Sequence, residues 1–334
     1  MRKTALLLFL LTNAVLWGQD GIDSTYIKTY SEELQIIPSI RYVRSEISIQ
    51  ANQNTSLEFL QGATVFGTRL QFDKWGIGLS IPTKLGSGKT NSSSFGLQLQ
   101  LFPKSLMIDA RASRMKGFQK VDLLNNHQDD FYGSAKDIRL LHLSLNPIYA
   151  FSKDKYSLRA ALQGTERQLK SQGSLLAALR VEYLRLKTNQ DIIESNQLNN
   201  ALNDYTFRQN GLEAGYAYTQ VIANHLIFSA IWLGGVAHTR TGFQQDQAKY
   251  HFKKWQINPI SKLTLSAGYQ SNRYVSSLRL NYQKRSIRSG EIQMDANGLS
   301  IQFVLGIRLH NPKLKSTISR TAKSLAHQFF PAKY

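Results

Sequence analysis

The sequence predicts an all-β fold: a transmembrane, antiparallel, up-and-down β-barrel of about twelve strands, with fourteen strands as the alternative. Two observations lead to this prediction. Segments of about ten residues, long enough to cross a bilayer as tilted strands, alternate apolar and polar side chains along most of the chain. Tight turns and long polar loops alternate between these segments, which is typical of outer-membrane barrels.

The first residues have the pattern of a secretory signal. Arg2 and Lys3 precede the apolar run Ala5–Leu11, and the small residue Gly18 follows. The chain contains no cysteine, so a lipid anchor on cysteine and a disulfide framework are both excluded. We therefore expect a signal peptide at 1–19, an N-terminal periplasmic extension at 20–35, the barrel at 36–310 and a C-terminal tail at 311–334.

The alternation is clearest near the end of the expected barrel. From Leu299 to Leu309 nearly every second residue is apolar, and Ser300, Gln302 and Arg308 lie on the opposite face. A soluble β-sandwich would alternate as well, so strand length and loops have to separate the two folds. The same pattern marks further segments at 66–72, 75–81, 95–101, 156–162, 212–218, 263–269 and 274–282.

The connections favour the barrel. After the first residues, no stretch reaches the ~18 apolar residues of a membrane-spanning helix, so strands would have to cross the bilayer. Tight turns are expected at Asp73–Lys74, Pro103–Lys104, Ser152–Lys155 and Gln270–Arg273. Long polar loops are expected near Pro82–Ser92, Lys116–Asp137 and Arg240–Lys254.

The strand count contains an inconsistency. About thirteen candidate strands lie between Ile36 and His310, whereas single-chain bacterial barrels have an even number. The alternation of short turns and long loops breaks between Gln163 and Asn210. Within that stretch, Ser174–Lys187 can also be read as a helix. We therefore expect twelve strands and place the miscount in this region.

The pattern changes after the last strand. No acidic residue occurs from Ala296 to Tyr334. Apolar residues recur at helical spacing between basic ones, which predicts a short, basic, amphipathic C-terminal helix. This helix would lie on an anionic membrane leaflet or cap the barrel mouth. The basic residues of the tail are Lys313, Lys315, Arg320 and Lys323.

Two segments resemble a known family. YSLRAALQGTERQLKSQGSLL at Tyr156–Leu176 and GLEAGYAYTQVI at Gly211–Ile222 are similar to a family of uncharacterised Gram-negative envelope proteins, catalogued only as a domain of unknown function. The resemblance extends over most of the chain. It implies an outer-membrane location and a barrel-like fold, and it brings no catalytic or binding residues with it.

The charge balance is strongly basic. Lysine and arginine total 41 against 22 acidic residues, which gives a net charge of +19. The basic residues are dispersed, and an exported protein rarely meets nucleic acid, so nucleic acid is not expected as a partner. Outer-membrane lipid and an anionic solute are the expected partners.

The expected lumen face is also basic. With the apolar faces outward, the lumen would contain three carboxylates, Asp109, Glu182 and Glu213, against a larger set of arginines. A net positive lumen would favour anions if a path is open. Alternatively, a narrow barrel could fill its interior with arginines that pair with acids and glutamines. The arginines of this face are Arg69, Arg111, Arg159, Arg180, Arg279 and Arg308.

One local pattern could carry chemistry. His142 and Ser144 share a strand face, and a His-x-Ser strand resembles that of outer-membrane lipid hydrolases. The lipid-facing side of this strand would consist of Leu141, Leu143 and Leu145. His142 and Ser144 would then point into the lumen, and the sequence identifies no acidic partner for them. The other histidines have no metal-ligand spacing, so neither a metal nor a cofactor is expected.

The sequence thus predicts an outer-membrane β-barrel of unknown specific activity. A narrow channel or solute-binding barrel with a basic lumen is the main interpretation. The alternatives are an envelope-interaction protein that acts through its long loops and basic tail, and a lipid hydrolase that uses His142 and Ser144. An enzyme is not expected.

Overall fold

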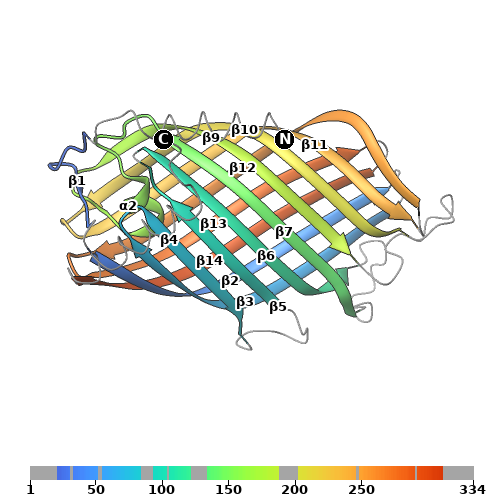
Figure 1. Ribbon diagram of the computed structural model, residues 1–334, viewed down its shortest axis with the longest axis horizontal. Coiled ribbons are helices and arrows are strands. Elements are labelled where there is room, and N and C mark those ends of the chain that lie inside the picture. The colour runs from blue at the N-terminus through green and yellow to red at the C-terminus, as the bar shows by residue number, and fades with distance from the viewer. Residues whose placement is uncertain are drawn as a thin grey trace, which may run out of the picture.

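Twelve strands form one closed antiparallel barrel in the computed structural model, which describes residues 21–30, 33–51, 55–83, 93–103, 105–121, 134–187, 202–245, 248–289 and 292–310 (Figure 1). Each strand pairs with its neighbours in sequence, and the last strand pairs with the first to close the ring. The predicted twelve-stranded, up-and-down, all-β barrel is confirmed. Its strands are β2 (Glu33–Ala51), β3 (Thr55–Phe72), β4 (Trp75–Pro82), β5 (Ser93–Leu101), β6 (Leu106–Val121), β7 (Ser134–Ala150), β9 (Gln172–Lys187), β10 (Leu202–Ile222), β11 (Leu226–Gln245), β12 (Ala248–Gln270), β13 (Tyr274–Ser289) and β14 (Ile292–His310).

The predicted alternation determines which side chains face outward. Trp75, Ile77 and Leu79 of β4 are exposed on the outer face, whereas Gly76 and Gly78 between them are buried inside. The same pattern holds on the other strands, so leucine, isoleucine and aromatic side chains cover the outside of the barrel.

Short turns connect the strands at one rim. Phe72 pairs with Trp75 across the predicted turn Asp73–Lys74, where Asp73 adopts a left-handed φ of 42°. The predicted turn before Tyr274 is also present. The chain enters the barrel wall at Glu33 and leaves it at His310, and these two residues pair with each other at this same rim. We call it the short-turn rim.

One predicted loop at the opposite rim is wrong. The stretch Arg240–Lys254 was expected to be a long loop, but β11 continues to Gln245 and β12 begins at Ala248. Gln245 pairs directly with Ala248. The polar composition of this stretch reflects strands that extend far from the short-turn rim, because polar residues also populate strands beyond an apolar belt.

The strand predicted at 156–162 is also wrong, and it explains the odd count. These residues form α2 (Leu158–Gln163), a single short helix between β7 and β9. The segment 156–162 lies before the stretch from Gln163 to Asn210, so the predicted place of the miscount is wrong as well. Ser157 caps its N-terminus by accepting a hydrogen bond from the Ala160 amide, and Gly164 ends it with a φ of 70°. Ser174–Lys187, which could also be read as a helix, lies instead in β9.

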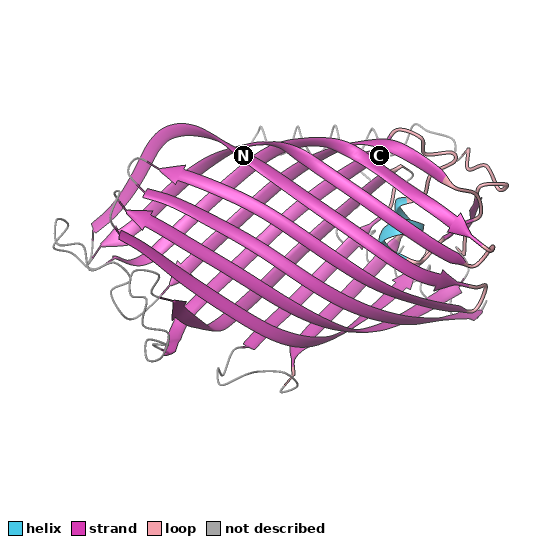
Figure 2. Ribbon diagram, turned by 180° about the vertical axis from the view of Figure 1, so that it is seen from behind, coloured by secondary structure: helices cyan, strands magenta, loops and turns pink. Residues whose placement is uncertain are grey.

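The helix lies inside the barrel next to the short-turn rim (Figure 2). After it, β8 (Arg167–Gln168) pairs antiparallel with β1 (Ile27–Lys28) from the N-terminal segment. We call residues 21–30 and 151–171 the plug. Tyr156 and Leu158 of the plug pack into a buried apolar cluster with Phe102, Leu176 and Leu233 of the barrel wall.

The wall changes its strand number along its height. β4 and β5 are short, and beyond their ends β3 pairs directly with β6, through Glu58 with Val121 and Leu60 with Gln119. Beyond the ends of β4 and β5, β3 and β6 are therefore direct neighbours in the wall.

The expected signal peptide at 1–19 and the expected helix at 311–334 lie outside the described residues. Within the described part of the chain, no helix has the length and apolar character needed to cross a membrane.

Candidate functional site

The lumen contains a balanced ion-pair network on β9, β10 and β13. Arg180 Nη2 lies 2.6 Å from Glu213 Oε1, and Arg285 Nε lies 3.0 Å from Glu182 Oε2. Arg180 and Glu182 are also 3.6 Å apart. Both carboxylates are buried, and each has an arginine as its partner, so this network carries little net charge.

His142 and Ser144 point into the lumen as predicted, because Leu143 and Leu145 are exposed on the outer face. The structure supplies an acidic neighbour that the sequence could not identify: Glu182 Oε1 lies 3.6 Å from His142 Nε2. However, Arg285 already engages the Glu182 carboxylate, and no hydrogen bond between His142 and Ser144 occurs among the described contacts. The arrangement therefore lacks the nucleophile–base contact of a hydrolase.

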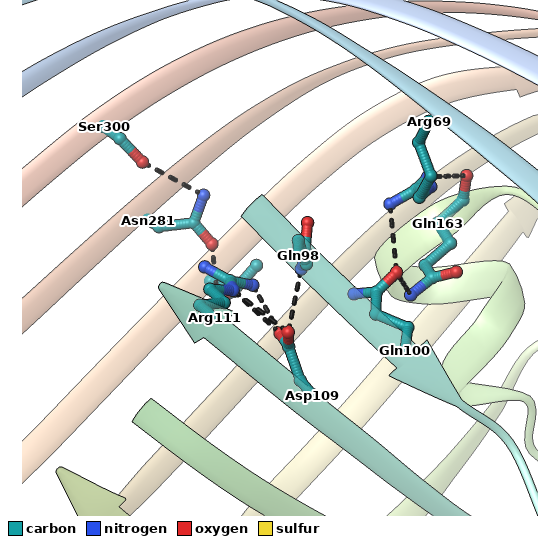
Figure 3. Close-up of polar contacts among 9 residues, drawn as sticks. Arg69, Gln98, Gln100, Asp109, Arg111, Gln163, Asn281 and Ser300 are labelled. Atoms are coloured by element: carbon teal, nitrogen blue, oxygen red, sulfur yellow. Dashed lines mark hydrogen bonds and ion pairs between the residues drawn. The ribbon is translucent and has the colours of Figure 1, made fainter. Parts of the chain in front are cut away.

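A second network lies on β5 and β6 (Figure 3). Arg111 Nε donates to both oxygens of Asp109, at 3.1 and 3.0 Å, and Gln98 donates to Asp109 at 2.9 Å. Arg111 pairs across the sheet with Gln98 and faces inward, yet 44% of its side chain is accessible. Arg111 therefore borders open space within the lumen.

Arg69 of β3 lies between this network and the plug (Figure 3). It donates to the Gln100 side chain at 3.5 Å and to the Gln163 carbonyl at 3.4 Å. Gln163 in turn donates to Gln100 at 2.6 Å. All of these acceptors are neutral, so they leave the charge of Arg69 uncompensated.

Five carbonyls at the end of α2 accept hydrogen bonds from side chains of the barrel wall. The last carbonyls of a helix lack partners within it, and they favour nearby cations. Strands β2, β3, β12 and β14 supply the donors, so the wall holds the plug from several sides. The pairs are Gln35 with Thr165, Arg69 with Gln163, Ser266 with Ala161, Gln270 with Ala160 and Arg308 with Gly164.

Two further contacts secure the plug. The Arg308 guanidinium stacks 4.0 Å from the ring centre of Tyr30, and burial raises the pKa of the Tyr30 hydroxyl. Arg159, which was expected on a barrel strand, lies on α2 instead. It pairs with Glu166 at 3.1 Å and donates to the Asp73 carbonyl at 2.5 Å, which joins the plug to the β3–β4 turn.

The structure thus places Arg69, Arg111, Arg180, Arg279 and Arg308 on the inner face of the wall, and Arg159 in the plug. Sequence reasoning missed three further cations inside: Arg41, Lys262 and Arg285. The signal was present, since Arg41 lies between the outward Ile40 and Tyr42. In the middle of the lumen, seven cations face the three predicted carboxylates. The cations are Arg41, Arg69, Arg111, Arg180, Lys262, Arg279 and Arg285.

No group of three or more potential metal ligands occurs among the residues that the structure describes. The basic residues of the predicted tail, Lys313, Lys315, Arg320 and Lys323, lie outside them.

Comparison with solved structures finds barrels with weak overall likeness. The outer membrane protease OmpT from Escherichia coli is 8% identical, with 84% of this chain and 97% of that chain covered and a TM-score of 0.44. The translocator domain of the autotransporter NalP from Neisseria meningitidis is 12% identical, with 90% and 97% covered and a TM-score of 0.40. An outer membrane channel from Pseudomonas putida F1 is 12% identical, with 85% and 99% covered and a TM-score of 0.37.

No curated protein matches the sequence of this chain. One family pattern does match, over residues 21–308, and it includes both segments on which the resemblance was noted. The chain therefore belongs to the DUF4421 family, a domain of unknown function.

Proposed function

We propose that this protein is an exported outer-membrane barrel whose basic lumen takes up anionic solutes. The main observation behind the proposal is the charge of the lumen, where seven cations face three carboxylates and Arg111 borders open space. In a low-dielectric channel, uncompensated positive charge attracts anions and repels cations. The solute would enter at the rim opposite the short-turn rim, which we call the loop side.

The membrane location rests on the outer face. Apolar side chains such as Trp75, Ile301 and Phe303 lie exposed on it. Contact between so large an apolar surface and water is unfavourable, whereas contact with lipid is not. Bacterial barrels place short turns toward the periplasm, so the short-turn rim would face that compartment. A signal peptide at 1–19 would direct export, and a basic helix at 311–334 would then lie on the periplasmic leaflet.

The plug adds a condition to this function. It lies inside the barrel next to the short-turn rim (Figure 2), where side chains of four strands donate hydrogen bonds to it. We propose that the plug obstructs the lumen in this position, so that passage to the periplasm requires the plug to shift. Uptake into the lumen from the loop side does not require this movement.

Planar-bilayer recordings test the proposal. The full-length protein should conduct weakly, and a variant with residues 153–170 replaced by a two-residue turn should conduct more, with a reversal potential that indicates anion selectivity. Heat-modifiable migration on gels would verify that both proteins are folded barrels. A folded variant without residues 153–170 that stays silent, or that selects for cations, would contradict the proposal.

A further inference from the structure

A small cavity lies in the lumen wall, between the inner faces of β2, β3, β4, β5 and β14. Its volume is about 50 Å³, and Arg41, Arg69, Gln98 and Gln302 line it together with small residues that include Gly78. A bound water needs roughly 10 to 15 Å³ of such space, so the cavity has room for a few waters. It therefore fits one compact polar group and excludes a sugar ring or a larger body.

The lining is cationic and lacks counter-charges. Among the ion pairs of the described residues, none involves Arg41, Arg69 or Arg279, and Arg279 lies beside the cavity because it pairs across the sheet with Gln302. Arg279 is only 6% exposed, and its Nε has no hydrogen-bond partner. The Nε of Arg69 is likewise buried without a partner.

The nearest carboxylate does not neutralise these arginines. Asp109 interacts electrostatically with both Arg41 and Arg69, but Arg111 already binds both of its oxygens. A buried cation without a partner is costly, and the cost is removed when an anion binds beside it. The cavity thus combines space for one group with donors that need an acceptor.

We infer that this cavity binds a single oxyanion group, a phosphate or a carboxylate, of a small water-soluble solute. Arg41 and Arg69 hold the oxyanion, since a planar guanidinium can donate two parallel hydrogen bonds to such a group. Gln98 and Gln302 supply further amide donors, and Arg279 adds positive charge from its position beside Gln302. The rest of the solute extends into the open lumen near Arg111.

The site faces the lumen, so a lipid headgroup at the outer surface of the barrel does not reach it. Arg41 alternates with Ile40 and Tyr42, which point outward, and Arg69 alternates with the outward Leu70. The ligand is therefore a soluble anion. This inference rests on the proposed function to the extent that the solute must enter the lumen from the loop side.

Titration of the purified full-length protein with inorganic phosphate, in neutral detergent and low chloride, tests the site by calorimetry. Saturable binding is expected, and Arg41→Gln and Arg69→Gln should each weaken it by about tenfold, because each removes a charged donor. Arg44→Gln is the matched control on the same strand, since Arg44 lies outside the lumen and pairs with Glu46 at 2.7 Å. The affinity of this control should be unchanged.

A second variant tests the contribution of the cavity volume to binding without changing any charge. A methyl group at Gly78 would meet only ordinary contacts, with Gln98 Cβ at 3.5 Å and Arg69 Cβ at 3.7 Å, so Gly78→Ala should fold normally. Because Gly78 lines the cavity, this methyl should still weaken phosphate binding. A parallel titration with acetate shows whether the smaller, planar carboxylate binds more tightly than the tetrahedral phosphate.

Three outcomes would overturn the inference: no saturable binding of phosphate or acetate, equal affinity in Arg41→Gln, Arg69→Gln and Arg44→Gln, or binding only to vesicles that contain lipid phosphate. The bilayer recordings distinguish this failure from that of the proposed function. Anion-selective conductance without saturable phosphate or acetate binding would contradict the binding site and still support the proposed function. Absence of both the conductance and the binding would contradict both the site and the function.

Discussion

The guanidinium of Arg308, near the end of β14, donates a hydrogen bond of 2.6 Å to the carbonyl of Gly164 at the end of the plug helix. Arg308 also donates to the Ser271 carbonyl in the β12–β13 turn and stacks on Tyr30. One side chain of the wall therefore contacts the helix end, a rim turn and the N-terminal segment. These contacts make Arg308 the most direct point at which to loosen the plug.

Arg308→Gln should loosen the plug without unfolding the barrel. A hydrogen bond from a charged donor contributes ~1.5 to 3 kcal/mol, so amide exchange in the plug should become at least about tenfold faster. Hydrogen-exchange mass spectrometry would follow the amide of Leu169, which bonds to the Tyr26 carbonyl. The control is Arg273→Gln, because Arg273 is exposed at the same rim. Equal exchange in the two variants would mean that Arg308 does not hold the plug.

Glu213→Gln should destabilise the barrel. It removes the carboxylate that lies 2.6 Å from Arg180 and leaves a buried arginine with a weaker partner. Breaking a buried ion pair costs ~3 to 5 kcal/mol, and unfolding in urea would measure the change. Glu46→Gln should cost under ~1 kcal/mol, since the Arg44–Glu46 pair is partly exposed. A small effect at Glu213 would show that Glu182 alone satisfies Arg180.

Gly215→Ala should prevent the barrel from closing normally. A methyl group at Gly215 would lie 1.9 Å from the Trp232 carbonyl oxygen, and backbone of the adjacent strand cannot move away without breaking its pairing. The folded fraction, read from heat-modifiable migration, should fall strongly. At Gly298 nothing lies within 4 Å of an added methyl, so Gly298→Ala should fold as the wild type does. Normal folding of Gly215→Ala would contradict the tight approach of β10 and β11.

Arginine substitutions on the outer face should reveal the membrane belt. The exposed apolar side chains of β14 lie between Ile301 and Leu309, with Leu305 in the middle of this stretch and Leu309 at its end. An outward arginine costs ~2 to 4 kcal/mol at the midplane and ~0 to 1 kcal/mol near the interface. Leu305→Arg should therefore reduce refolding into lipid vesicles far more than Leu309→Arg does. Equal effects at the two positions would argue against a bilayer centred near Leu305.

The sequence predicts the wall well because each strand has a single apolar face. Along β14, the alternation from Leu299 to Leu309 assigns every side chain to one face, and the structure follows it. The segment 156–162 was misassigned because Leu158 and Leu162 satisfy both a two-residue and a helical period. The cap at Ser157 and the left-handed Gly164 decide for the helix, and these cues are weaker than hydrophobic periodicity.

The lumen was harder to predict than the wall. The inward direction of Arg69, Arg180 and Arg279 follows from alternation alone. Their partners do not, because the pairing of Arg180 with Glu213 depends on the register between β9 and β10. The inward direction of Lys262 was missed because Ser261 and Lys262 are both polar, so the alternation of apolar and polar residues does not show which face of β12 points outward there. No local pattern could have placed Arg41 beside Gln302, since β2 and β14 are the first and last strands.

The direct pairing of β3 with β6 means that β4 and β5 leave the wall on the side away from the plug, so fewer strands contribute to the circumference there. The width of a barrel grows with its strand number. Under the proposed function, a solute that enters from the loop side would meet this narrower part of the barrel before it reaches the arginines. Size would then select the solute before charge does, and a bulky anion would be excluded by its shape.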